Sequence, residues 1–269
     1  MHITFFVLAA LLYATCAVLP SRQRIAISAG TAVGWLLHGG ALWADMVQPG
    51  SLRIGFAFVL SATLWISVAA YWLENRNFSL DSLRVMVLPT AAVAVILPGL
   101  FPGSLIPLEG KSSLFPWHVV IAILAYSSLT IAAFHAVLMA LQEAQLHASP
   151  GEARGRWLAR AIDRLPALLT MEKILFRMIA FGFALLTMTV LSGIVFSEQL
   201  FGIPIKWDHK TIFTLLSWIL FGLLLAGRFW RGWRGKMALR FTLTGFATLL
   251  LAYVGSRFVL EVVLHRSLA

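Results

Sequence analysis

Long apolar runs recur from the first residues of this chain to its last, and they constrain the fold more than any other feature. Each run is about 20 residues long, the length that an α-helix needs to cross the hydrocarbon core of a bilayer. Of the 269 residues, 60% are hydrophobic and 12% are charged, and the mean hydropathy is +0.87. Soluble domains are roughly 45–50% apolar and about 25% charged. The sequence therefore excludes an ordinary soluble enzyme and a disordered chain.

These runs predict an all-α, polytopic membrane helix bundle of about eight transmembrane helices. The sequence lacks the alternating segments of about ten residues that mark a membrane β-barrel. The fourth span is the weakest of the eight, because Pro89 and Pro98 interrupt it. The predicted spans cover residues 3–19, 25–43, 54–73, 85–101, 117–141, 174–197, 211–229 and 239–263.

The distribution of lysine and arginine predicts how the bundle is oriented. If both termini lie on the outer (periplasmic) side, the inner loops hold fifteen of the 21 basic residues and the outer loops hold five. An excess of positive charge marks the cytoplasmic loops of membrane proteins. The same bias accounts for the net charge of +10 without a nucleic-acid partner, so we expect none.

The spans divide into an N-terminal half, residues 1–114, and a C-terminal half, residues 115–269, with one long inner segment in the second half. Within that segment, Ser149-Pro150-Gly151-Glu152 is typical of a helix start. Apolar and basic residues then fall on opposite faces of a helix at about 150–166. We expect a basic amphipathic helix on the inner membrane surface, with a docking site for a cytoplasmic partner as the alternative.

Histidines are the informative polar residues, because an ionisable group in lipid usually faces a partner, a cavity or a ligand. His38, His118, His209 and His265 come from four different spans and gather at or near the predicted outer face. His135 lies 17 residues after His118 on the same span, about 25 Å along the helix. His135 therefore belongs to the inner half and cannot share a ligand with His118.

Imidazole binds zinc, copper and heme iron. Heme needs one or two axial histidines, a flat apolar slot and a cation for its propionates. Gly30, Gly34 and His38 share one helix face and offer such a slot, with close helix packing through the glycines as the alternative. Arg257 is the candidate cation, with an ion pair to Glu261 as the alternative.

The stretch 202–210, which reads GIPIKWDHK, resembles the tryptophan-rich outer loop of the cytochrome c assembly, heme-handling family of CcsA and CcmC. Phe201 and Ile205 replace two tryptophans of that loop, and Thr211 replaces a glutamate. The residues that match it are Gly202, Trp207, Asp208 and Lys210.

Three further stretches resemble the same family, so that the resemblance covers about residues 115–265. Residues 230–236 resemble its inner G-W-R-G turn, and Pro116-Trp117-His118-Val119 resembles its first outer histidine segment. Residues 255–265 resemble the stretch that ends in its second outer histidine, with one extra residue. Gly227 stands where the larger members carry a membrane histidine. The N-terminal spans and the eight-span count resemble the small HemX/YpjD-like branch.

This resemblance implies an inner-membrane, multi-pass protein that binds heme b near its outer face and hands it to apocytochrome c or another acceptor. We expect heme handling in cytochrome c maturation, without covalent catalysis by this chain. One alternative is a HemX-like membrane regulator of heme biosynthesis that acts through a cytoplasmic partner. The other is a transporter accessory subunit without heme, which predicts a colourless protein.

The expected heme site combines the histidine pattern with this resemblance. His38 and His118 are the preferred axial ligands of the iron, because they lie at compatible depths on two separate spans. His265 is the alternative partner of His118. The remaining expected contacts are Trp207 and Asp208 at the heme edge, Arg257 at a propionate, and Gly30 and Gly34 in the slot.

Overall fold

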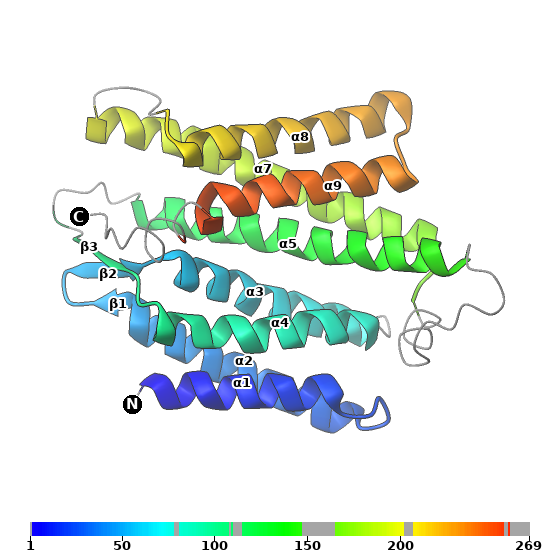
Figure 1. The fold of residues 1–269 in the computed structure, drawn as a ribbon, viewed down its shortest axis with the longest axis horizontal. Helices are drawn as coiled ribbons and strands as arrows, with labels where there is room; N and C mark the ends of the chain where they lie inside the picture. The colour runs from blue at the N-terminus through cyan, green and yellow to red at the C-terminus, as the bar shows by residue number, and fades with distance from the viewer. Residues whose placement is uncertain are drawn as a thin grey trace.

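The computed structural model describes residues 2–77, 81–107, 109, 115–146, 165–201, 207–255 and 258. Within these residues, antiparallel α-helices run back and forth along one direction (Figure 1). A short π-helical turn, η1 (Leu251–Gly255), continues the last of them. The helices are α1 (His2–Val18), α2 (Arg24–Met46), α3 (Phe56–Asn77), α4 (Asp81–Leu100), α5 (Phe115–Leu146), α7 (Leu168–Phe201), α8 (His209–Arg231) and α9 (Gly235–Leu250).

The lengths and composition of these helices confirm the predicted helical membrane bundle. Seven of them, α2 to α5 and α7 to α9, are long and apolar enough to cross a membrane. The remaining predicted span, 3–19, coincides with α1, whose apolar stretch Ile3–Val18 is shorter than these seven. Seven spans are therefore supported by length, and an eighth at α1 stays a prediction.

The two prolines of α4 do not divide it. The helix is continuous over Asp81–Leu100 with Pro89 and Pro98 inside it. A proline inside a helix removes one backbone hydrogen bond, which neighbouring elements must compensate in a membrane. α4 is flanked by α1 and α3, so it lies inside the bundle rather than alone in lipid.

A small antiparallel sheet, which the sequence analysis did not predict, lies at one end of the bundle (Figure 1). Its strands are β1 (Val47–Gln48), β2 (Ser51–Ile54) and β3 (Ser104–Pro107), in the order β1-β2-β3. Pro49 and Gly50 turn the chain between β1 and β2, and Gly50 has a φ of 68°, which favours glycine. Arg53 Nη1 lies 3.1 Å from Asp45 Oδ1 and ties β2 to the end of α2.

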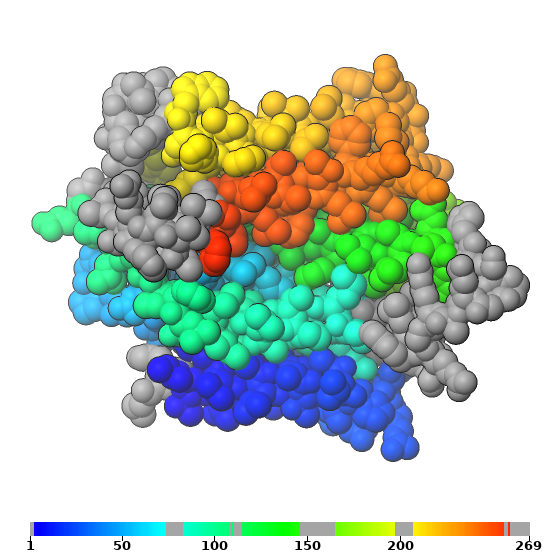
Figure 2. Space-filling view, in the orientation of Figure 1, coloured from blue at the N-terminus to red at the C-terminus, as the bar shows by residue number. Residues whose placement is uncertain are grey.

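Two helices form the centre of the bundle and two lie at its periphery. In α3 and α5, 61% of the apolar span is buried, compared with 17% in α7 and 22% in α8. The largest core cluster reaches from Tyr13 in α1 to Leu249 in α9, so both halves of the chain contribute to it. The space-filling view shows the helices packed side by side from α1 to α8 (Figure 2). The boundary at residue 114 stays a prediction.

The two ends of the bundle differ in what they carry. The start of α1, the sheet and η1 lie at one end (Figure 1), which the distribution of lysine and arginine predicts to be the outer end. The opposite, inner end carries the connections from α1 to α2 and from α8 to α9. The sidedness itself stays a prediction. The predicted amphipathic helix at about 150–166 lies mostly outside the described residues.

Candidate functional site: a histidine at the outer end

His118 lies in the first turn of α5, at the outer end, and α7 holds its ring in place. His118 Nδ1 is 2.7 Å from Ser192 Oγ. One turn further along α7, the ring of Phe196 meets the imidazole edge-on, with 5.5 Å between the ring centroids. The His118 side chain is half-buried, so part of it faces outward from this contact. The imidazole is therefore oriented by two residues of one neighbouring helix.

The hydrogen bonds of Ser192 decide which nitrogen of His118 carries the proton. A serine hydroxyl has a single hydrogen to donate. Ser192 Oγ lies 2.7 Å from Met188 O and 3.1 Å from Thr189 O, both of which only accept. Ser192 therefore donates to α7 and accepts from His118 Nδ1–H. In the neutral ring, Nε2 is left with its lone pair, and no hydrogen-bond partner of Nε2 occurs among the described residues.

His38 has a different environment in the N-terminal half. It is 0% exposed in the middle of the contact between α1, α2 and α3. Its Nε2 lies 2.9 Å from Ser61 Oγ, and its Nδ1 lies 3.4 Å from the hydroxyl of Tyr13. Both ring nitrogens are thus within hydrogen-bond distance of hydroxyl groups. This is the arrangement of a buried histidine whose polar atoms are satisfied by packing.

The glycine face below His38 is filled by α1. A Cβ on Gly30 would lie 2.6 Å from Cys16 Sγ, and one on Gly34 would lie 3.0 Å from the ring of Tyr13. The glycines therefore let α1 and α2 approach closely, as in membrane helix pairs with small residues at the interface. Cys16 and Tyr13 thus lie against this face as close helix packing requires, and heme binding at the glycines stays a prediction.

The preferred axial pair, His38 and His118, is not in contact in the part of the chain that the structure describes. The main helical neighbours of α2 are α1 and α3, whereas those of α5 are α7, α3 and α9. α3 thus packs against both helices, and each histidine has its own set of partners. The sequence analysis compared the depths of the two histidines along their helices. It could not show which helices pack around each of them.

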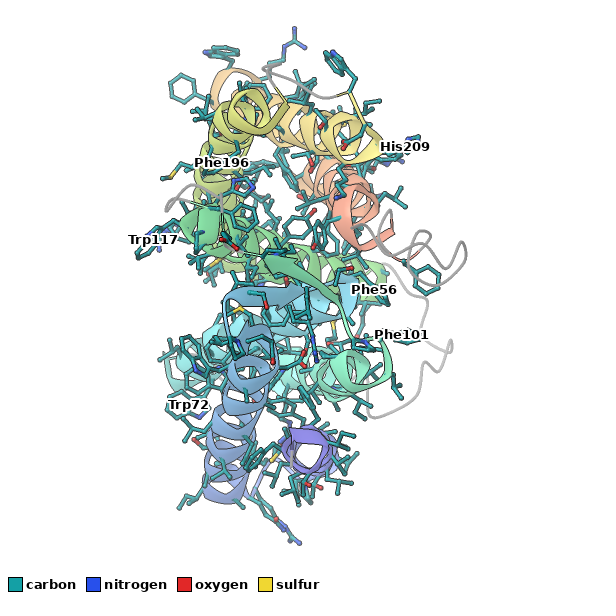
Figure 3. All side chains as sticks on the ribbon, turned by 90° about the vertical axis from the view of Figure 1, so that its left-hand side faces the viewer. Phe56, Trp72, Phe101, Trp117, Phe196 and His209 are labelled. Atoms are coloured by element: carbon teal, nitrogen blue, oxygen red, sulfur yellow. The ribbon has the colours of Figure 1, made fainter. Side chains whose placement is uncertain are left out.

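The tryptophan-rich loop reaches the described residues at Trp207 and Asp208. Asp208 is the N-cap of α8, because its Oδ1 accepts from the Thr211 amide at 2.9 Å and from the Thr211 hydroxyl at 3.0 Å. The Trp207 side chain is 70% exposed. Figure 3 looks at this end of the bundle and shows His209 at the start of α8 and Trp117 and Phe196 near α5 and α7. Asp208 therefore has a structural role that holds whether or not heme is nearby.

Two expected site residues, Arg257 and His265, lie outside the described residues. Their roles as propionate anchor and second axial ligand stay proposals.

His135, on the inner side of His118 along α5, is 0% exposed, and its Nδ1–H donates to Ile131 O at 2.9 Å. That bond is local to α5, so it links His135 to its own helix.

Ser192 and Phe196 are the functional candidates that the sequence analysis missed. Both lie in the apolar run of α7, more than 70 residues from His118, and neither belongs to a motif. One signal was available: Ser192 falls near the outer end of the predicted span 174–197, at the depth of His118. Only the pairing of α5 with α7 shows that the two meet.

At the inner end, the turn that resembles the family's G-W-R-G motif is held by ion pairs. Glu172 of α7 lies 2.6 Å from Arg228, just before that turn, and 3.4 Å from Arg234, within it. The Arg228 guanidinium also lies over the ring of Phe176, 4.5 Å from its centroid. Gly232 ends α8 with a φ of 66°. These contacts fix the path between α8 and α9, far from His118.

Comparisons with known proteins agree with this picture. The family model described as "Cytochrome C assembly protein" matches residues 33–264, which extends the resemblance into the N-terminal half and includes His38. The inner membrane protein YpjD of Escherichia coli K12 is 30% identical over 146 residues, covering 54% of this chain and 52% of the relative. The cytochrome c biogenesis protein CcsA of Thermosynechococcus vestitus is 25% identical, covering 84% of this chain and 82% of the relative.

The match to YpjD thus spans about half the length of that relative, whereas the more distant match to CcsA spans most of both chains. Seven membrane-length helices and an inner-membrane relative make this a multi-pass inner-membrane protein. Because the family model covers well over half of the sequence, the chain belongs to the cytochrome c assembly family.

Proposed function

We propose that this protein binds heme near its outer face through His118 and handles that heme in cytochrome c maturation. The observation that carries the proposal is the contact between His118 and Ser192, which holds the ring and leaves Nε2 with its lone pair. Iron-ligating histidines commonly donate their other ring N–H to a neighbouring acceptor, which sets the tautomer and the ring orientation. The serine hydroxyl supplies that acceptor here.

The donor set fits heme better than a site built from several protein ligands. Among the described residues, no group of three or more His, Cys, Asp and Glu side chains lies together. A zinc site needs such a group, whereas the porphyrin supplies four ligands to heme iron and leaves one or two positions for the protein. One oriented imidazole is therefore enough to supply one axial ligand of heme iron. Bound heme would supply the group to be transferred, and this chain would hold and present it.

For the second axial position we propose His265, following the alternative in the sequence analysis. His38 is less suitable, because iron binding would break its contact with Ser61 or Tyr13 inside a packed helix interface. We further propose that Arg257 binds a propionate and that the exposed Trp207 ring lies at the heme edge. Asp208 contributes by capping α8 and so placing Trp207 at its start.

The names of the relatives suggest the role in the cell. CcsA is named as a cytochrome c biogenesis protein, and YpjD as an inner membrane protein. We propose that this chain takes part in the same process by carrying heme b and delivering it to apocytochrome c or another acceptor. The outer position of His118 suits delivery on the periplasmic side.

The test is the visible spectrum of the protein purified in mild detergent, with and without added heme. We expect a six-coordinate b-type spectrum in the reduced-minus-oxidised difference. His118→Gly should lose this spectrum, and added imidazole should restore it, because a free ligand then occupies the vacated position. A wild-type protein that stays colourless with added heme would overturn the proposal.

The regulatory alternative makes a different prediction. A regulator that acts through a cytoplasmic partner needs the segment at about 150–166, whereas a heme carrier does not. Deleting residues 152–165 should leave the heme spectrum intact if the protein is a carrier. Loss of an effect on heme synthesis in cells that carry this deletion, with the heme spectrum unchanged, would favour the regulator.

A further inference from the structure

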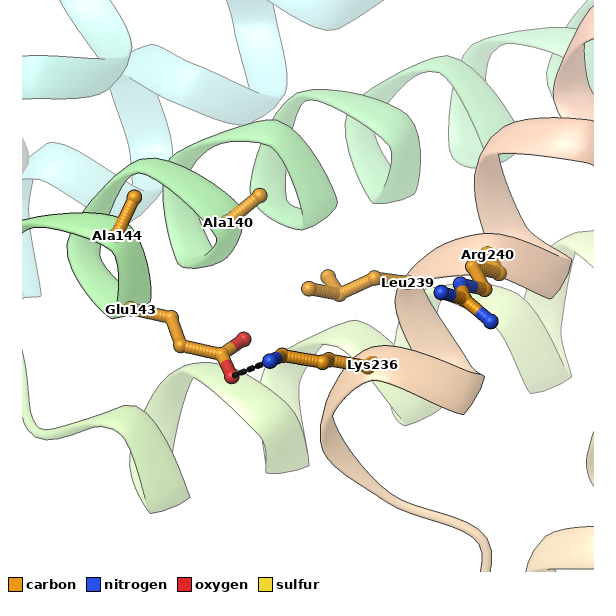
Figure 4. Close-up of a pocket in the computed structure, with 6 residues that line it drawn as sticks. All are labelled: Ala140, Glu143, Ala144, Lys236, Leu239 and Arg240. Atoms are coloured by element: carbon orange, nitrogen blue, oxygen red, sulfur yellow. Dashed lines mark ion pairs between the residues drawn. The ribbon is translucent and has the colours of Figure 1, made fainter. Parts of the chain in front are cut away.

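A cavity of about 340 Å³ opens at the inner end of the bundle, between the last turns of α5 and the first turns of α9 (Figure 4). Ala140, Glu143 and Ala144 line it from α5, and Lys236, Leu239 and Arg240 line it from α9. The alanines are four residues apart and so share one face of α5. Their small side chains leave the space that the cavity occupies.

The cavity combines an apolar floor with a charged rim. Leu239 is 7% exposed and the two alanines are partly buried, so the inner wall is apolar. The Lys236 and Arg240 side chains are exposed at the opening. Figure 4 shows Glu143 facing Lys236 across it, with 3.8 Å between Oε1 and Nζ. That separation is long for a charge-assisted hydrogen bond, so the pair leaves Lys236 able to bind a further anion.

The charges at this opening do not balance. Lys236 and Arg240 are two cations, and Glu143 is the one carboxylate among the described residues that line the cavity. Arg240 makes no ion pair with any residue in the described part of the chain. A further carboxylate of this end, Glu172, is paired with Arg228 and Arg234. An arginine and a lysine with a surplus of positive charge are suited to a phosphate group.

The depth of the cavity indicates where that phosphate comes from. Glu143 lies in the final turns of the apolar span of α5, and Lys236 lies at the start of the span of α9. The opening is therefore at the level where the hydrocarbon core meets the lipid headgroups, on the side rich in basic residues. Basic pockets between membrane helices on the cytoplasmic side bind anionic lipid headgroups. None of the described residues that line the cavity is aromatic, so they offer a nucleotide base no ring to stack on.

We propose that this cavity binds the phosphate of an anionic phospholipid of the inner leaflet, and that the lipid bridges α5 and α9. Arg240 and Lys236 contact the phosphate, and the apolar floor accommodates the glycerol and the first methylenes of the acyl chains. α5 carries His118 at its other end. The bound lipid therefore stabilises one of the two helices that hold the outer histidine. This proposal does not depend on heme binding.

The experiment measures phospholipid binding to the full-length protein in detergent by native mass spectrometry. The probes are phosphatidylglycerol, which is anionic, phosphatidylcholine, which is zwitterionic, and soluble glycerol 3-phosphate. We expect one tightly bound phosphatidylglycerol per protein and weak binding of phosphatidylcholine. The double variant Lys236→Gln/Arg240→Gln should bind phosphatidylglycerol about tenfold or more weakly, because two charge-assisted contacts are lost.

Two further variants distinguish binding in this cavity from nonspecific attraction between surface cations and an anionic lipid. Arg22→Gln/Arg24→Gln removes two exposed cations from another connection of the same end and should leave binding unchanged. Ala144→Leu fills the cavity without changing its charge and should weaken binding. Equal loss in both double variants, or equal binding of the two lipids, would overturn the proposal. If glycerol 3-phosphate binds as tightly as the lipid, the site takes a soluble phosphate and the lipid assignment is wrong.

Discussion

The N-terminal and C-terminal halves each place a histidine in an apolar helix, but the two rings are held in opposite ways. His38 is fully enclosed, and both of its nitrogens lie near hydroxyl groups, of Tyr13 and Ser61. His118 is half-buried, and one nitrogen is engaged by Ser192. The first arrangement satisfies a buried polar group, and the second orients a ring and leaves a lone pair. A histidine in a membrane span is therefore a ligand candidate only when its neighbours leave one nitrogen available.

The largest expected difference between the halves is in heme binding. His118→Ala should abolish the six-coordinate b-type spectrum, because the proposed iron ligand is gone. His38→Ala should retain it, because His38 serves packing. Reduced-minus-oxidised spectra of both variants, at matched protein concentration, make the comparison. If His38→Ala loses the band while circular dichroism shows that it stays folded, the proposal that only His118 of the two binds the heme iron is wrong.

The second prediction concerns stability, in which we expect the loss of His38 to have a larger effect than the loss of His118. His38→Ala removes a fully buried ring, leaves a cavity and strips Ser61 and Tyr13 of their partner, so we expect a loss of about 2–4 kcal/mol. His118→Ala removes a half-buried ring and should cost about 1 kcal/mol or less in the heme-free protein. Thermal unfolding in detergent measures both. The assignment of a structural role to His38 requires it to be clearly the more costly of the two.

A third prediction sharpens the role of Ser192. Ser192→Ala keeps His118 but removes the acceptor that sets its tautomer, so heme affinity should fall about ten- to a hundredfold. The spectrum at saturating heme should keep its six-coordinate shape, because both iron ligands remain. Heme titration measures the change. Thr187→Ala is a suitable control, since it also removes a hydroxyl of α7, one that accepts from Trp218 Nε1 at 2.9 Å; it should leave heme affinity unchanged.

The smallest expected effect concerns the longer of the two contacts at His38. Tyr13→Phe removes a hydroxyl that lies 3.4 Å from Nδ1, at the upper limit of a hydrogen bond, while the ring keeps its packing. We expect a loss of about 0.5–1 kcal/mol in stability and no change in heme binding. Ser61→Ala, at 2.9 Å, should cost more than Tyr13→Phe in the same assay. The reverse order would mean that Tyr13 is the stronger partner of the ring.

Most of the fold was predictable because a membrane limits the possible structures. Backbone polar groups in lipid must be satisfied within the chain, so each long apolar run has to be a helix. The eight predicted ranges accordingly overlap α1 to α5 and α7 to α9, although the apolar stretch of α1, Ile3–Val18, is shorter than the seven membrane-length spans. The three strands were not predicted, since β1 has two residues and β2 and β3 have four each. Segments that short show no alternation of apolar and polar residues that could be recognised in the sequence. β1 pairs with the adjacent β2, and only the tertiary structure brings β3 from a distant loop to β2.

The candidate site was predictable in part. Spacing along the chain indicated His118 correctly as a residue at the end of a span, and that this end faces outward stays a prediction. The same reasoning favoured His38 as its partner, because depth along a helix is readable from spacing. Lateral position is not readable in this way, since every span has several possible neighbours. The structure packs α3 against both α2 and α5, and it pairs α5 with α7, which brings Ser192 and Phe196 to the imidazole.

The sequence by itself determined that this chain is a multi-span helical membrane protein, which end of each span each polar residue occupies, and which family it belongs to. Those properties follow from composition, from the rise of 1.5 Å per residue and from short motifs, all of which are local. Only the tertiary structure decided that Gly30 and Gly34 pack against Cys16 and Tyr13 and that a hydroxyl group lies near each nitrogen of His38. It also decided that one nitrogen of His118 has no hydrogen-bond partner among the described residues. These are properties of contacts between helices, and an apolar helix surface in lipid is compatible with many partners until specific side chains interlock.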